Sequence, residues 1–154
     1  MIQSYIDTPI ALTSNSDSVR FQRDCIRTGS CNCNNYRSWL CHNEGSANYE
    51  ITKGGLYEIN FNATVSSATA GAIAFQLYNN GEAIPGTLMV ETIAAADDFA
   101  NIGINKKITV CCNGNATISV RSVATVPTPT TPATPVTTVT PIVVSSNFSI
   151  EKKS

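Results

Sequence analysis

The sequence has little charge and few of the residues on which catalysis depends. Only 14% of its 154 residues are Asp, Glu, Lys or Arg, the formal net charge is −1, and there is a single His. A net charge this close to zero excludes a chain that coats nucleic acid along its whole length, so we expect no nucleic-acid partner. No run of about 18 apolar residues occurs, and we therefore expect no membrane span.

Motifs of the common enzyme classes are also missing. The chain has no GxGxxG, no Walker lysine loop, no GxSxG and no HExxH, which are the signatures of nucleotide, hydrolase and zinc-protease sites. His42 follows Cys41 and lies near Glu44, but adjacent side chains in extended backbone point to opposite faces. Asp97 and Asp98 are typical of a solvated turn. We therefore expect no enzyme activity, no catalytic residue and no cofactor.

The first residues do not resemble a secretion signal. They carry no basic segment, and Asp7 and Pro9 interrupt the place where an apolar stretch would lie. We therefore expect the chain to fold in a cytosol, where disulfides are disfavoured.

Thr, Ser and Asn are abundant, with 18, 15 and 15 residues. These side chains suit strand faces and turns better than helix interiors. Apolar residues also recur at every second position, most clearly over 56–65, where Tyr57, Ile59 and Phe61 share one face. Further strands are predicted over 73–77, 87–93, 100–110, 117–121 and 142–150, and weaker ones over 4–12, 17–22 and 47–52.

Turn signals separate these strands. The Asn80-Gly81 pair predicts a tight hairpin turn. No stretch fits an amphipathic helix, and only 92–99 could form a helical turn. The expected fold is all-β, an antiparallel sandwich or barrel.

Two segments differ from this pattern and divide the chain. Residues 1–48 hold weak strands and an irregular Cys/Arg-rich loop, whereas 49–154 form the expected body. Residues 126–141 contain five of the seven prolines, and Pro/Thr-rich backbone of this kind is extended and cannot be a central strand. We expect it to form an exposed loop.

The Cys/Arg-rich segment is the main candidate for a contact with another protein. Arginine and tryptophan are frequent anchors of interfaces, and we predict a docking surface for an acidic partner formed by Arg20, Arg23, Arg27, Arg37 and Trp39. Four cysteines could hold zinc, form two disulfides or remain free thiols: Cys25, Cys31, Cys33 and Cys41. Their spacing lacks the paired CxxC knuckles of zinc sites. For Cys111 and Cys112 we expect one side chain in the core and one on the surface.

The runs GGLYEINFNATVSS, AFQLYNNGEAIPGT, FANIGINKKITV, ATISVRS and VVSSNFSIEKK resemble TNF/C1q-like trimeric jelly rolls, in particular the short versions among structural proteins of bacteriophages. The resemblance covers about residues 50 to 152. It implies an antiparallel jelly-roll sandwich and a homotrimer. It also implies that a trimer axis is lined by Tyr57, Ile59, Phe61 and Phe148.

The resemblance implies a non-enzymatic role. We expect a virion protein that is assembled in the cytoplasm of a bacterial host and decorates the capsid or a head fibre, with the major capsid protein or another virion protein as partner. Two alternatives are a spore-surface C1q-like protein and a module that binds host glycans or surface proteins. Glycan sites favour aromatic residues beside amides, as at Tyr78 with Asn79 and Asn80, or Trp39 with Asn34 and Asn35.

Overall fold

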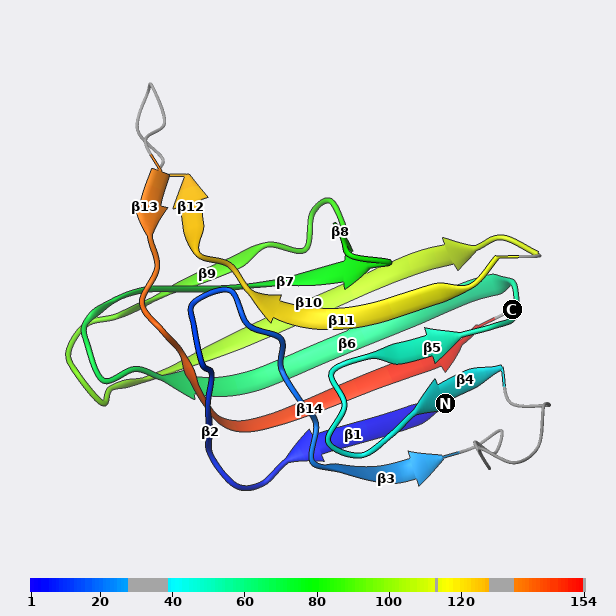
Figure 1. Cartoon of the computed structure of the whole chain (residues 1–154), viewed down its shortest axis with the longest axis horizontal. Coiled ribbons are helices and arrows are strands. Elements are labelled where there is room, and N and C mark those ends of the chain that lie inside the picture. Colours follow the sequence, from blue (N-terminus) through cyan, green and yellow to red (C-terminus); the bar gives the residue numbers. More distant parts are fainter. Residues whose placement is uncertain (28–38, 113, 128–134, 154) are drawn as a thin grey trace.

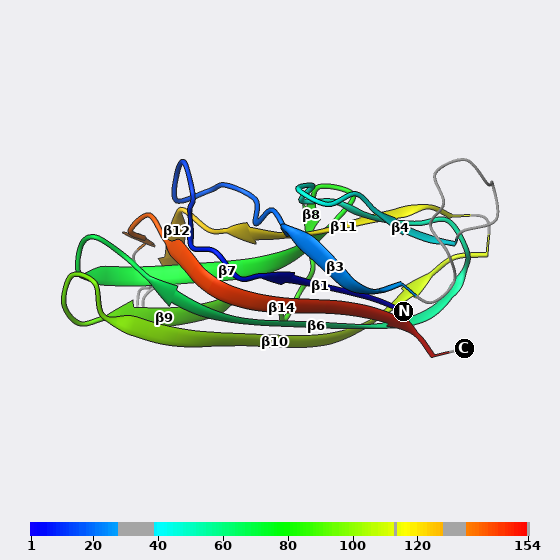
Figure 2. The same cartoon turned by 90° about the horizontal axis from the view of Figure 1, so that it is seen from below.

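The computed structural model describes residues 1–27, 39–112, 114–127 and 135–153. Two antiparallel sheets pack face to face in a flat sandwich, and Figures 1 and 2 show the two layers from above and edge-on. In these described ranges there is no helix, and accordingly none that could cross a membrane. The expectation of an all-β antiparallel sandwich is confirmed.

The first sheet is built on three long neighbouring strands. Its order is β10 (Phe99–Val110), β6 (Gly55–Ser66), β14 (Ile142–Lys152), β1 (Ile2–Ile6) and β3 (Arg23–Arg27), with β2 (Ile10–Ala11) beside β14. Along β6 every residue from Gly55 to Ser66 pairs with β10. The N-terminal segment is part of this sheet, because β1 lies between β14 and β3.

The second sheet has shorter strands. Its order is β4 (Leu40–His42), β5 (Tyr49–Ile51), β11 (Ala116–Ser122), β7 (Gly71–Asn79) and β8 (Glu82–Ala83), with β9 (Met89–Ile93) beside β7. The turn from β7 to β8 consists of Asn80 and Gly81, whose φ values are 52° and 84°. Positive φ at both central residues is the geometry of a two-residue hairpin turn, so the hairpin expected from Asn-Gly is confirmed.

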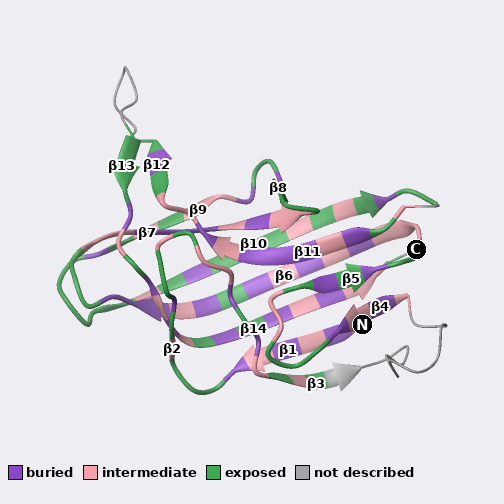
Figure 3. Ribbon diagram, in the orientation of Figure 1, coloured by how far each residue is buried: buried purple, intermediate pink, exposed green. Residues whose placement is uncertain are grey.

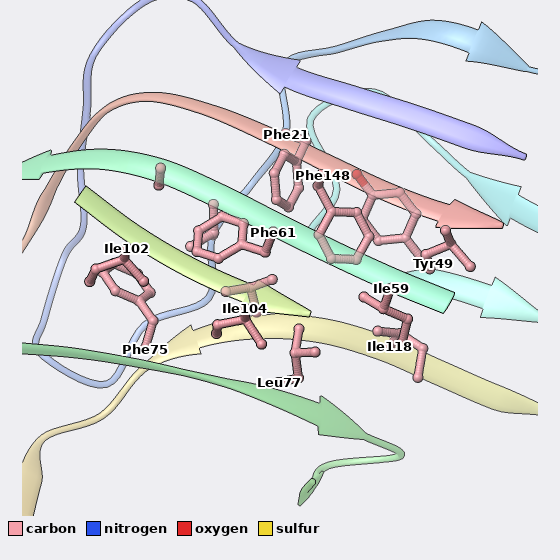
Figure 4. Packing of buried hydrophobic residues seen from close by; sticks show 14 of the residues in the cluster. Phe21, Tyr49, Ile59, Phe61, Phe75, Leu77, Ile102, Ile104, Ile118 and Phe148 are labelled. Atoms are coloured by element: carbon pink, nitrogen blue, oxygen red, sulfur yellow. The ribbon is translucent and has the colours of Figure 1, made fainter. Parts of the chain in front are cut away.

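Side chains alternate between the two faces of each long strand, as Figure 3 shows for β6 and β10. The inward set forms one core between the sheets. At its centre the rings of Tyr49 and Phe148 are 4.4 Å apart, and Phe21 lies 5.1 Å from Phe148 (Figure 4). Phe61 connects this group to Phe75, with ring centroids 5.9 Å apart. Aromatic pairs at these distances add to the stabilisation from area burial.

Three local expectations need correction or detail. Residues 17–22 are not a strand, since only Ser18 bridges to Arg121 and the strand of this region is β3. Residues 94–98 form a turn and not a helical segment. The Pro/Thr-rich segment begins and ends as a two-stranded hairpin of β12 (Thr125–Pro127) and β13 (Pro135–Thr137), which stands out from the sandwich in Figure 1.

Candidate functional site

The outward face of the first sheet is a flat, neutral surface rich in Asn. Because the apolar residues of β6, β10 and β14 point inward, the alternate residues of the same strands point outward. Cross-strand pairing brings the outward amides together: Asn62 lies opposite Gly103 on one side and Asn147 on the other, and Asn60 lies opposite Asn105. These side chains also bond to one another, since the amide of Asn105 donates to the Asn60 side-chain oxygen.

A groove runs across the middle of this face. Its volume is ≈ 540 Å³, and it is lined by Asn62, Ala63, Thr64, Asn101, Ile102, Gly103, Ser145, Ser146 and Asn147. None of the lining residues is charged. Gly103 leaves the groove open, because a Cβ atom there would lie 3.0 Å from Oδ1 of Asn62. Thr64 and Asn101 form one wall through a 3.0 Å hydrogen bond from the threonine hydroxyl.

The two ends of the face differ in chemistry. At one end Phe99 is 70% exposed, and it lies in the same cross-strand row as Ile142. At the other end Lys153 lies 2.9 Å from Glu58 and 2.6 Å from Glu151. The bond from Lys153, followed by that from an Asn amide, lowers the pKa of the Glu58 carboxyl group, and the two carboxylates raise the pKa of Lys153. The face is therefore polarised from an apolar end to an ion-paired end.

A second group of polar side chains is enclosed in the protein. Nδ1 of His42 lies 2.8 Å from Oδ1 of Asp24, and both side chains are inaccessible to solvent. Nε2 of His42 lies 3.1 Å from the carbonyl oxygen of Ser46, to which it donates, and the Ser4 hydroxyl donates to the same Asp24 oxygen. The imidazole also stacks on Tyr49, with ring centroids 4.0 Å apart. Burial raises the pKa of the Tyr49 phenol.

Hydrogen bonds in this enclosed group join Ser4, Asp24, His42 and Ser46, which come from four separate segments of the chain. Nε2 of His42 donates to the carbonyl oxygen of Ser46, and Nδ1 faces the carboxylate of Asp24. The sequence suggested Glu44 as the acid nearest to His42, but Glu44 instead accepts a 3.2 Å bond from the backbone N–H of Asp24. A substrate has no path to a pair that is fully covered. The arrangement therefore supports a structural role for His42.

Comparison with known proteins gives a fold but no family. No protein-family model matches the sequence, and no curated protein is similar to it. Among solved structures, murine APRIL at pH 5.0 superposes with a TM-score of 0.51 at 12% identity, covering 96% of this chain and 97% of that one. Murine APRIL at pH 8.5 superposes with a TM-score of 0.47, also at 12% identity, covering 97% and 98%. The fold is a TNF-like jelly-roll sandwich.

The residues expected to line a trimer axis lie inside the TNF-like sandwich. Tyr57, Ile59, Phe61 and Phe148 are each 0% exposed in the single chain, and the Tyr57 hydroxyl donates a 2.6 Å bond to the carbonyl oxygen of Lys53. A side chain without accessible surface has none to bury against a second copy. This corrects the expectation: β6 and β14 can offer another chain only their alternate, outward residues.

The expected docking residues are only partly brought together. Arg20 and Arg23 are exposed, whereas the side chain of Arg27 and the whole of Arg37 lie outside the described residues. Trp39 is half-buried and packs against the core, with its ring 5.8 Å from that of Tyr57. The tryptophan therefore contributes mainly to packing, and two exposed arginines remain on this surface.

The expected zinc set lies partly outside the described residues, because Cys31 and Cys33 belong to the segment 28–38. Of the other two, Cys25 is exposed and Cys41 is half-buried. Elsewhere in the described ranges no three His, Cys, Asp or Glu side chains gather as metal ligands.

The two consecutive cysteines differ from expectation. Cys111 and Cys112 are both exposed, although strand alternation predicted one of them in the core. The reason is that β10 ends at Val110, and the chain then turns with a bond from the N–H of Gly114 to the carbonyl oxygen of Cys111.

The candidate glycan cluster at the β7–β8 hairpin is largely occupied by internal contacts. The guanidinium of Arg121 covers the ring of Tyr78 at 4.8 Å. The side-chain oxygen of Asn80 accepts from the N–H of Thr117, and its amide donates to the carbonyl of Asn115. The other candidate cluster includes Asn34 and Asn35, which lie outside the described residues.

Proposed function

We propose that this protein is a non-enzymatic structural protein that assembles as a homotrimer through the outward face of its first sheet. One observation carries the proposal: the outward face of the first sheet has a groove lined by uncharged side chains, whereas the large apolar residues of the same strands are buried inside the single chain. TNF/C1q-like domains, which the sequence resembles, form trimers. The TNF-like fold is consistent with the same arrangement.

The polarity of the face favours one orientation of the copies. With the strands of all copies running in the same direction around an axis, the Phe99 ends meet one another and the Lys153–Glu58 ends meet one another. A copy turned end for end would instead place the phenylalanine against ion-paired carboxylates, which would lose water without gaining partners. Rotational symmetry with parallel strands is therefore the better match.

The trimer is tested by measuring the mass in solution by light scattering, for which we expect three times the 16.4 kDa of the chain. Asn62→Arg should give monomers, because three guanidinium groups would meet at the axis and like charges at an interface cost several kcal/mol. Thr92→Arg is the matched control, since Thr92 is exposed on β9 of the other sheet. A monomeric wild type, or a trimer that tolerates Asn62→Arg, would refute this interface.

We further propose that the trimer decorates a bacteriophage capsid or head fibre, with the N-terminal segment facing an acidic shell. Support comes from the sequence resemblance to phage structural proteins and from Arg20 and Arg23, which are exposed. The expected result is that the protein co-sediments with capsids and that Arg20→Glu with Arg23→Glu abolishes the association. Failure of the wild type to co-sediment would reject the virion role and leave the trimer intact.

A host-surface binding role is the second candidate. The observation that favours it is the β12–β13 hairpin, which projects from the sandwich and exposes 39% of Val136. A cell-binding assay separates the two roles: deletion of residues 126–137 should abolish adhesion to host cells in a binding module and leave capsid association unchanged in a decoration protein.

A further inference from the structure

Two adjacent cysteines lie on the surface at one end of the sandwich. Cys111 and Cys112 follow the last residue of β10, and both are exposed. The turn connects the two sheets, because β10 belongs to the first sheet and β11, which begins at Ala116, belongs to the second (Figure 1). This end is remote along the strands from the exposed Phe99, which begins β10 at the opposite end. Neither cysteine lines the groove of the proposed trimer face.

The backbone that carries the two thiols is held on both sides. Gly54 packs directly behind it, since a Cβ atom on Gly54 would lie 2.6 Å from Cα of Cys112 and 2.9 Å from the carbonyl oxygen of Cys111. The same carbonyl accepts a 2.9 Å bond from the N–H of Gly114. The backbone of Cys111 and Cys112 is therefore held by close packing against Gly54 and by this hydrogen bond, and both side chains lie on the surface.

Adjacent cysteines are poorly placed to form a disulfide with each other. Consecutive Cα atoms are about 3.8 Å apart across a trans peptide, whereas disulfides need Cα atoms about 4.4–6.8 Å apart and sulfurs about 2.05 Å apart. A metal or metalloid bridge is less demanding. With bonds of about 2.3 Å to each sulfur, the sulfurs stay about 3.3–3.8 Å apart. The geometry of neighbouring thiols therefore favours chelation over oxidation.

The side chains around the two cysteines determine which metal or metalloid the pair could bind. In the described part of the chain no third His, Cys, Asp or Glu joins these cysteines to make a metal cluster. Structural zinc requires four ligands, so the pair alone does not build a zinc site. A trivalent arsenical that already carries one carbon substituent needs two thiolates to complete its coordination. It belongs to the soft centres that thiolates prefer.

We propose that Cys111 and Cys112 form a dithiol site for soft, thiophilic centres, with organic trivalent arsenicals as the ligand class. In the reaction the As–O double bond of an arsine oxide is replaced by two As–S bonds. The two thiol protons leave with the oxygen as one water molecule, and no electrons are transferred. The step therefore needs no oxidant and takes place on the reduced protein.

The test uses phenylarsine oxide on the folded, reduced full-length protein, followed by tryptic digestion and mass spectrometry. Cleavage after Lys107 and Arg121 releases residues 108–121, which contain both cysteines and no other cysteine. We expect this peptide to carry one phenylarsenic group with the loss of one water and to have no free thiol. The remaining cysteines fall in other peptides, so their reaction does not interfere with this result.

Chelation is separated from simple thiol reactivity by competition with a monothiol. Because the second As–S bond is intramolecular, 2-mercaptoethanol should remove the arsenical from Cys112→Ser or Cys111→Ser at about 100-fold lower concentration than from the wild type. Circular dichroism confirms that each variant is folded. Equal removal from wild type and both variants, or an unmodified 108–121 peptide in the wild type, would overturn the proposal. Trimer formation is measured separately and does not decide this outcome.

Discussion

Removal of the buried carboxylate of Asp24 gives the sharpest test of the structure. Its side chain and that of His42 are both 0% exposed and only 2.8 Å apart. Asp24→Ala leaves the imidazole enclosed without its partner and leaves the Ser4 hydroxyl without its acceptor. Breaking a buried pair in this way costs about 3–5 kcal/mol, because the remaining group stays desolvated and uncompensated. For a chain of this length that corresponds to a Tm lower by about 6–20 °C.

The double variant Asp24→Leu with His42→Phe distinguishes pairing from simple packing. Replacement of both partners by apolar groups of similar volume removes the polar requirement, so the double variant should be more stable than Asp24→Ala alone. Asp7→Ala is the control, because Asp7 is exposed, and it should change stability by no more than about 0.5 kcal/mol.

The assay is urea unfolding followed by circular dichroism at one fixed protein concentration, since association shifts apparent stability. A loss below about 1 kcal/mol for Asp24→Ala, or a double variant no more stable than Asp24→Ala, would show that His42 and Asp24 are not a buried pair.

Three further outcomes follow from packing and hydrogen bonding. Phe61→Ala should lower the free energy of unfolding by about 3–5 kcal/mol, independently of protein concentration, because Phe61 is a core residue and not an interface residue. Gly54→Ala should cost about 1–3 kcal/mol, since its methyl group would meet the backbone of Cys112, as measured by urea unfolding. Hydrogen bonds from the side chain and backbone of Thr13 lower the pKa of Asp17. The ionised carboxylate therefore stabilises the folded state near neutral pH, and this stabilisation is lost below about pH 4. The difference in urea midpoint between wild type and Asp17→Asn should accordingly shrink on acidification.

Each of these outcomes has a matched comparison. Asn62→Ala, next to Phe61 but outward, should be nearly neutral for unfolding of the monomer. Gly114→Ala should cost less than Gly54→Ala, because its nearest contact would be 3.4 Å away. Thr13→Val is the comparison for Asp17: it removes the hydroxyl that donates a 2.6 Å bond to the Asp17 carboxylate, so the acid dependence linked to Asp17 should weaken. Equal effects within a pair would contradict the structural explanation.

Alternation along the chain was sufficient to determine the class of fold. The period of two over 56–65 separates Tyr57 and Phe61 from Asn60 and Asn62, and the structure places the first pair inside and the second on the outward face. The Asn80-Gly81 turn could also be predicted from the sequence, because both residues tolerate the positive φ that a two-residue hairpin requires. Such signals are local, and strand geometry converts them directly into faces and turns.

Only the tertiary structure decided which face is available to a partner and which polar groups are enclosed. A period of two separates two sets of side chains but does not say which set meets a second sheet and which remains free for another copy. Asp24 and His42 are 18 positions apart in an irregular segment, and they meet because β1, β3 and β4 come together in space. Sequence patterns report neighbours along a strand, whereas burial and pairing depend on contacts between distant strands, which arise only when the two sheets close on each other.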